Sequence, residues 1–183
     1  MAQSFFALLA LVLTVNFAMS VNQWYATFQR ATLYREVEEM AQSVAVETME
    51  IVRTRAFDQA VVDGTVTGTA ADLALFSDAD AFGISGNATC QAFGGTATCD
   101  DLDDFHGQQV LRPFVMGQDT IWFAVNLTVR YVDWDASTGQ ATPASGKTFY
   151  KQVIVRVQDD WDGDLKPFLP TPIQLDRVFA YGF

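Results

Sequence analysis

The chain has 183 residues and a net charge of −11, with 22 Asp and Glu against 11 Lys and Arg. This length allows one compact domain with an appendage and excludes two full domains. Because nucleic acids and anionic lipids are bound through Lys and Arg, the acidic balance argues against both as partners.

The first stretch of the chain, SFFALLALVLTVNFAMSV at residues 4–21, is apolar, and no charged side chain precedes Arg30. A secretory signal peptide needs a positively charged start, which MAQS lacks. A transmembrane helix needs about 20 apolar residues, and residues 4–28 reach that length, with Trp24 and Tyr25 as an interfacial aromatic pair. The third interpretation is a helix that packs against copies of itself.

A single helix is predicted from near residue 2 to near residue 58. The first glycine is Gly64 and the first proline is Pro113, so neither helix breaker interrupts this stretch. From residue 33 onwards, apolar residues recur at helical spacing in two adjacent rows, which form a broad amphipathic face. The first row is Leu33, Val37, Met40, Val44 and Ile51, and the second is Tyr34, Ala41, Ala45, Met49, Val52 and Ala56.

These patterns divide the chain into an apolar half-helix at residues 1–29, an amphipathic half-helix at residues 30–63 and a head domain at residues 64–183. A helix of this length is too long for a domain of about 120 residues to cover. We expect the amphipathic half to pack on the head and the uncharged half to project. An exposed apolar side chain costs about 1.5–3 kcal/mol, so the uncharged half is expected in lipid, among copies of itself, or first in one and then in the other.

The head is predicted to be rich in strands. Loops are expected up to residue 104, with a short helix near residues 70–76. Strands follow in which apolar residues alternate, although Lys151 interrupts the apolar face of one of them, and Pro113 marks an edge or a bulge in another. The predicted strands are residues 109–116, 120–133, 148–158 and 173–181. The sequence therefore predicts an α+β fold in which an antiparallel sheet of at least four strands packs one face on the amphipathic half-helix.

Two cysteines, Cys90 and Cys99, enclose the glycine-containing loop CQAFGGTATC, which can close. The flanking residues offer no His or third Cys for a zinc site, so a disulfide is the preferred interpretation. A disulfide would imply an oxidising compartment outside the cytoplasm. The alternative is a pair of unrelated thiols.

A long N-terminal helix that is first apolar and then amphipathic, followed by an antiparallel sheet and a small disulfide loop, resembles the architecture of type IV pilins and pseudopilins. In that family a peptidase removes a short basic leader, and the apolar half-helix anchors the subunit in the inner membrane before it packs in the filament core. Phe5 stands where the family usually has a glutamate. The resemblance implies a filament core made of Phe5, Phe6, Leu8, Leu9, Leu11, Val12, Leu13, Val15 and Phe17.

No catalytic motif or phosphate-binding loop occurs, so the sequence does not predict an enzyme. The single histidine, His106, lies in DDLDDFHG and is expected to be solvated or paired with Asp. Asp160, Asp162 and Asp164 alternate in DDWDGDL, a spacing that can converge on calcium if the backbone turns, although a solvated turn is the alternative. Asn87 and Asn126 begin glycosylation triplets.

The sequence therefore predicts a structural subunit of an extracellular pilin-like filament, whose partners are copies of itself and, before assembly, the inner membrane. The main alternative is a membrane-anchored protein with one span and an extracytoplasmic β-rich binding domain, such as a minor pseudopilin.

Overall fold

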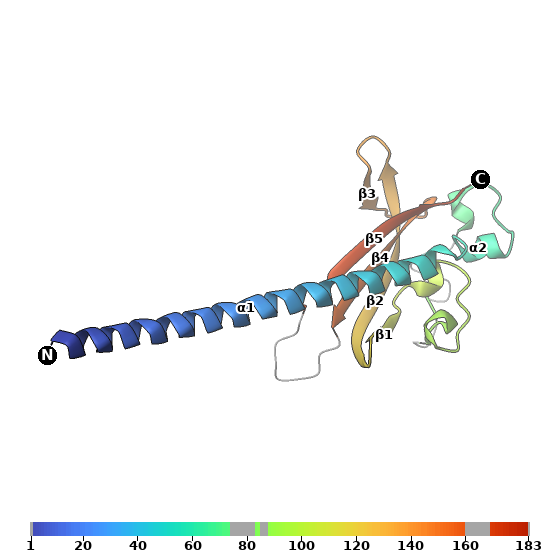
Figure 1. Cartoon of the computed structure of the whole chain (residues 1–183). Helices are drawn as coiled ribbons and strands as arrows, with labels where there is room; N and C mark the ends of the chain where they lie inside the picture. The colour runs from blue at the N-terminus through green and yellow to red at the C-terminus, as the bar shows by residue number, and fades with distance from the viewer. Residues whose placement is uncertain (1, 74–82, 85–87, 160–168, 183) are drawn as a thin grey trace. The chain divides into compact units, whose positions relative to one another are not determined.

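The computed structural model describes residues 2–73, 83–84, 88–159 and 169–182. The chain divides into two compact units, Met1–Glu39 and Met40–Phe183. A long helix is followed by short helical turns and then by five strands, which confirms the predicted α+β class (Figure 1).

Helix α1 (Ala2–Arg53) contains no glycine or proline, as the sequence predicts. In the second unit, its residues 40–53 bury one face against the sheet. The buried positions recur every three or four residues, as expected for one side of a helix: Met40, Ala41, Val44, Ala45, Met49 and Val52.

Helix α1 ends five residues earlier than predicted, because tertiary hydrogen bonds redirect the chain. Its last turn tightens, with the N–H of Arg55 donating to the Val52 carbonyl. The N–H of Ala56 then donates to the Asp100 carbonyl, and the Ala56 carbonyl accepts from the N–H of Leu102. Residue 56 is thereby paired with a segment 45 positions away, a contact that no local pattern indicates.

Short helical elements follow, of which only a helix near residues 70–76 was predicted. They are α2 (Gln59–Val62), η1 (Ala70–Asp72), η3 (Gln91–Phe93) and η4 (Asp103–Phe105). Asp58 is the N-cap of α2, and its side chain accepts a hydrogen bond from the N–H of Ala60. The predicted helix is represented by η1, and residues 74–76 lie outside the described part.

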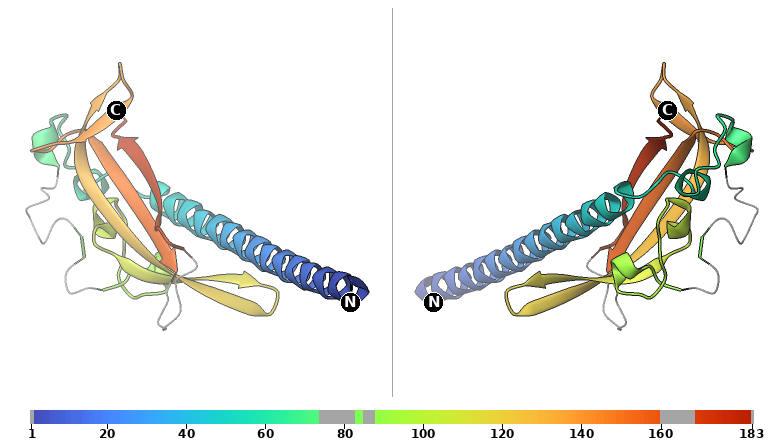
Figure 2. Two further views of the ribbon diagram at one scale, coloured as in Figure 1. Left: turned by 90° about the vertical axis from the view of Figure 1, so that its left-hand side faces the viewer. Right: turned by 90° about the vertical axis from the view of Figure 1, so that its right-hand side faces the viewer.

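The five strands form an antiparallel sheet in the order β1-β2-β4-β5, with β3 paired to the far end of β2. Their bounds are β1 (Gln109–Met116), β2 (Asp119–Asp135), β3 (Gln140–Pro143), β4 (Tyr150–Asp159) and β5 (Ile173–Ala180). Figure 2 shows that β1 and the first part of β2 form a hairpin that reaches beyond the neighbouring strands. The four predicted strands are confirmed, whereas no strand was predicted at β3.

The core of the second unit lies between residues 40–53 of α1 and the inner face of the sheet. Alternate residues of the two central strands point into it, as the period of two requires: Phe123, Val125, Leu127, Val129 and Tyr131 on β2, and Val153, Val155 and Val157 on β4. Two ion pairs at the rim link α1 to the outer strands, Glu47 with Arg112 of β1 and Glu50 with Arg177 of β5. They are solvent-exposed on at least one side, so packing contributes most of the stability.

Candidate functional site

The first candidate site is the apolar half-helix, residues 2–29 of α1. Large apolar side chains are exposed all around it rather than along one stripe: Phe6, Leu9, Leu11, Val12, Leu13, Val15, Phe17, Met19, Val21, Trp24, Tyr25 and Phe28. Seven of the nine residues predicted to form a filament core are in this set, and the side chains of Phe5 and Leu8 lie outside the described part. Contiguous exposed apolar surface on this scale marks an interaction site.

Three polar side chains of this half-helix bond to its own backbone. Thr14 Oγ1 donates to the Ala10 carbonyl at 2.7 Å, and Asn16 Nδ2 donates to the Val12 carbonyl at 2.8 Å. Thr27 Oγ1 makes the same bond one turn back, to the Gln23 carbonyl. A polar group satisfied in this way can enter an apolar interface at low cost. The interruptions at Thr14, Asn16 and Thr27 are therefore compatible with burial in an apolar interface.

Aromatic residues are concentrated at the C-terminal end of the half-helix. Trp24 and Phe28, one turn apart, stack with ring centroids 5.8 Å apart. A shallow groove lies on each side of Tyr25, one reaching Phe17 and Val21 and the other reaching Phe28 and Leu33. Such grooves between large side chains are the complement that protruding side chains of another helix require.

The predicted transmembrane helix is not supported. Among the residues whose side chains the structure describes, no helix is both long enough and apolar enough to cross a bilayer.

The predicted disulfide between Cys90 and Cys99 is confirmed. Both half-cystines are buried, and the ten-residue segment folds back so that the N–H of Gln91 donates to the Ala97 carbonyl. Gly95 makes this closure possible, because a Cβ there would lie 1.9 Å from the Thr89 carbonyl oxygen. The glycine therefore provides the space for a close backbone approach.

A second candidate site is a buried polar cluster around Lys151, which we name the Lys151 cluster: Phe57, Asp58, Asp101, Asp103, Tyr131 and Lys151. Its charged members come from the segment before α2, the segment at η4 and strand β4. Lys151 Nζ lies 2.5 Å from Asp58 Oδ2 and 2.6 Å from Asp103 Oδ1. All three side chains are buried. The sequence showed only that Lys151 interrupts an apolar strand face, and no local pattern connected it to Asp58 or Asp103.

Hydrogen bonds hold the acids of the Lys151 cluster in different ways. The Tyr131 hydroxyl donates to Asp58 Oδ2 at 3.1 Å. Asp101 Oδ1 accepts from the N–H groups of Asp103 and Asp104, at 2.7 and 3.0 Å. Asp103 differs, because neither of its carboxyl oxygens accepts a backbone hydrogen bond in the described part, and its Oδ1 contacts Lys151 Nζ at 2.6 Å. The position of the Asp103 carboxyl group therefore depends on its contact with Lys151.

Burial governs the ionisation of these acids. Loss of hydration raises the pKa of Asp103 to about 8, even though the Lys151 ammonium acts in the opposite direction. Burial, with repulsion from Asp104, raises the pKa of Asp101 to about 6. Burial also raises the pKa of Tyr131, so its hydroxyl remains a donor. A buried acid that binds a proton near neutral pH, beside a lysine, is an arrangement that can transfer protons.

The predicted calcium site cannot be compared with the structure. Asp160, Asp162 and Asp164, predicted as a calcium site, lie outside the described residues, as does Asn87. Among the residues that are described, no cluster of His, Cys, Asp and Glu is arranged to hold a metal.

His106 is half-buried rather than solvated. Its Nδ1 lies 2.8 Å from the carbonyl oxygen of Val129 and 3.2 Å from the N–H nitrogen of the same residue. Burial lowers the pKa of its imidazole. The histidine therefore docks the η4 segment on strand β2.

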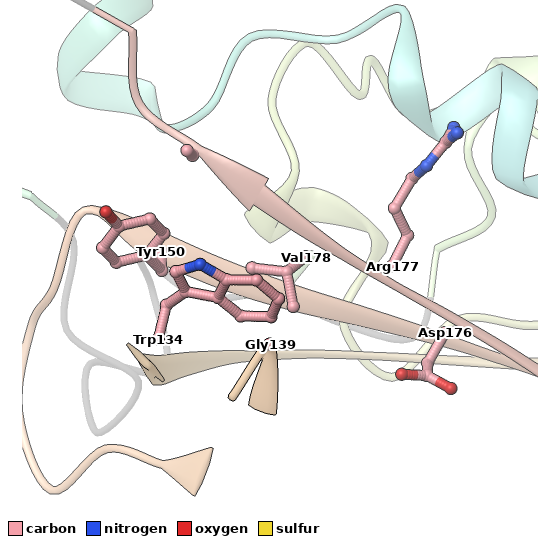
Figure 3. A pocket seen from close by; sticks show the side chains of 7 residues that line it. Trp134, Gly139, Tyr150, Asp176, Arg177 and Val178 are labelled. Atoms are coloured by element: carbon pink, nitrogen blue, oxygen red, sulfur yellow. The ribbon is translucent and has the colours of Figure 1, made fainter. Parts of the chain in front are cut away.

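A shallow groove between the β2–β3 hairpin and β5 carries aromatic side chains (Figure 3). Trp134, Tyr150 and Val178 lie close together, while Arg177 points away from them and contacts Glu50. Asp176 Oδ2 accepts from Gln152 Nε2 at 2.9 Å. The charged groups of this groove are thus engaged elsewhere and do not converge on a ligand position.

Comparison of the chain with protein-family models, with curated proteins and with solved structures finds no match. The function is therefore inferred from the exposed half-helix and the head alone.

Proposed function

We propose that this protein is a structural subunit of an extracellular pilin-like filament, and that copies of it assemble by packing their apolar half-helices in the fibre core. The long helix, the antiparallel sheet on which its C-terminal part packs and the disulfide loop support this assignment.

The observation that carries the proposal is the exposed apolar surface of residues 2–29. Burying one large apolar side chain stabilises an assembly by about 1.5–3 kcal/mol, and this surface offers 12 described side chains of that kind. Its hydroxyl and amide groups at Thr14, Asn16 and Thr27 already have partners in the same helix. A large driving force and a small polar penalty favour a dry helix–helix interface.

Charge favours another copy of the chain as the partner. The half-helix has no charged side chain before Arg30, so copies do not repel one another along it. The rest of the chain carries the whole net charge of −11, which favours its exposure to solvent. Small residues at Ala7, Ala10 and Ala18 permit close approach of neighbouring backbones.

The disulfide supports a location outside the cytoplasm. Disulfides form and persist in oxidising surroundings and are rare where thiols are kept reduced. A bond between Cys90 and Cys99 therefore suits a subunit whose head faces the exterior.

A charge placed in the half-helix tests the proposal. In Leu11→Asp, each copy would bring an unpaired carboxylate into the apolar interface, where burial of an isolated charge is very costly. We expect electron microscopy of sheared surface material to show loss of fibres, with the subunit still present in the cells.

Val46→Asp is the matched control. Val46 is also exposed on α1, at 52% compared with 62% for Leu11, but lies in the half that packs on the head. Fibres should persist in this variant. Normal fibres from Leu11→Asp cells would show that the half-helix is not the filament core.

A further inference from the structure

Lys151 is wholly enclosed and its amino group is held among three oxygens. Nζ lies 2.5 Å from Asp58 Oδ2, 2.6 Å from Asp103 Oδ1 and 2.9 Å from the carbonyl oxygen of Phe57. A nitrogen this near a carboxyl oxygen approaches the carboxyl carbon at about 3–3.5 Å, the separation of reacting atoms in a near-attack arrangement. The fold thus brings together Lys151, as a potential nucleophile, and the carboxyl carbon of Asp58, as a potential electrophile.

The surroundings of this pair exclude water and are partly aromatic. Nζ lies 4.7 Å from the centre of the Phe57 ring and 5.0 Å from that of Tyr131. Taking an ammonium and a carboxylate out of water carries a penalty that their mutual attraction does not always offset. Condensation of the two groups would remove both charges and release the product water from the core.

Hydrogen bonds hold the carboxyl group of Asp58 in a position where a nucleophile can attack its carbon. The N–H of Ala60 donates to Oδ1 at 3.0 Å, and the Tyr131 hydroxyl donates to Oδ2 at 3.1 Å. A backbone donor on Oδ1 can stabilise negative charge that develops there during attack. The other oxygen, Oδ2, faces the lysine.

We propose that Lys151 and Asp58 condense to form an intramolecular isopeptide bond, with Asp103 as the group that transfers protons. The proposal is independent of filament assembly, because every participating residue belongs to the unit Met40–Phe183.

The atoms balance without a co-reactant. A proton first passes from the Lys151 ammonium to Asp58 Oδ2, which leaves a neutral amine and a neutral acid. The nitrogen lone pair then attacks Cγ, and the electron pair of the Cγ–Oδ1 π bond moves onto Oδ1, where the Ala60 N–H donates. Asp103 gives its proton to the Oδ2 hydroxyl. The electron pair on Oδ1 then re-forms the Cγ–Oδ1 π bond, the Cγ–Oδ2 bond breaks with its electron pair going to Oδ2, and water leaves. Asp103 finally takes one proton from the nitrogen and is restored.

Asp103 meets the requirements of this role in two ways. Its Oδ1 lies 2.6 Å from the nucleophilic nitrogen, and no backbone donor in the described part occupies either of its oxygens. Its raised pKa, about 8, lets it hold a proton at neutral pH and exchange it with the reacting pair. After condensation, the amide N–H has the Phe57 carbonyl as an acceptor, and the amide oxygen keeps the Ala60 donor.

The bond would join the segment after α1 covalently to strand β4. This link would hold residues 40–53 of the helix and the centre of the sheet together when the chain is pulled or unfolded.

Mass spectrometry of the full-length chain, reduced and alkylated, tests the proposal. We expect an intact mass lower than that of the sequence by one water, and no tryptic cleavage after Lys151. The diagnostic product is residues 56–130 joined to residues 148–156, because Arg112 precedes a proline and trypsin does not cleave there. A full mass together with release of the peptide ending at Lys151 would overturn the proposal. Dehydration without joined peptides, as in succinimide formation at Asp63-Gly64, would also overturn it.

Two substitutions separate the role of Asp103 from general destabilisation. Asp103→Asn cannot transfer the proton, so its mass should remain that of its own sequence while its circular dichroism stays native. Asp104→Asn, at the neighbouring acid that accepts the N–H of Asp100, should still lose one water. Joined peptides in Asp103→Asn would overturn the role given to Asp103. The mass of the unsubstituted chain decides the bond itself, whether or not the variants fold.

Discussion

At the scale of single residues, the burial of Asp103 makes the stability of the fold depend on pH. Its pKa of about 8 compares with an ordinary value of 3.8, so between these values the folded chain holds a proton that the unfolded chain has released. The free energy of unfolding must then fall as pH rises through this window. The same sign holds for Asp101 between pH 3.8 and about 6.

We therefore predict that the urea midpoint of the full chain, dispersed in non-ionic detergent, is lower at pH 8 than at pH 5. Asp135, whose pKa is lowered to about 2, does not titrate in this range. His106, whose pKa is lowered from 6.5, acts with the opposite sign below that pH, so the fall above pH 6.5 is the part that reports Asp103. Asp103→Asn should flatten this part of the fall, because an amide does not titrate. A midpoint that stays level or rises from pH 5 to pH 8 would contradict the prediction.

At the scale of elements, the contact between α1 and the sheet depends on small residues. Ala41 and Ala45 are wholly buried on the helix face that meets the sheet, beside the larger Val44 and Met49. Methyl groups at these two positions let the helix approach the valine-rich strands closely. Native interiors are packed densely enough for added carbon atoms at such a place to force a shift.

Ala45→Leu is predicted to destabilise the fold by about 1–3 kcal/mol through overpacking. Ala31→Leu is the matched control, because Ala31 is an exposed residue of the same helix and the change is chemically identical. Thermal unfolding of the two variants should show a lower midpoint for Ala45→Leu alone. Equal midpoints would show that the interface tolerates extra volume and that our account of its packing is wrong.

At the scale of the whole molecule, folding and assembly are predicted to reside in different parts of the chain. A chain shortened to residues 30–183 keeps every residue found buried among those that the structure describes and, since residues 1–29 carry no charged side chain, the whole net charge of −11. It should remain folded, soluble and monomeric, because it lacks the exposed apolar half-helix and its copies repel one another. Circular dichroism and sedimentation velocity would measure this. Polymerisation of the shortened chain would place the assembly contacts in the head.

Local sequence patterns were sufficient to predict most of the helices and strands and the disulfide. The absence of glycine and proline before Gly64 and the apolar rows at helical spacing predicted the helix and its buried face at Met40, Val44 and Val52. Alternation of apolar residues predicted four strands, including the bounds of β1. The spacing of Cys90 and Cys99 predicted their bond. These features are readable because neighbouring residues determine them.

The tertiary structure alone decided where the helix ends, that β3 pairs with β2, and what surrounds Lys151. Ala56 leaves the helix because Asp100 and Leu102 offer hydrogen bonds across the fold. In the sequence, Lys151 is only a polar interruption of a strand, and its meaning depends on Asp58 and Asp103, which are 93 and 48 positions away. Burial, and with it the raised pKa of Asp103, exists only after α1, η4 and β4 have packed together. Periodicity therefore predicts which side of an element is buried, and only packing decides which distant polar groups meet there.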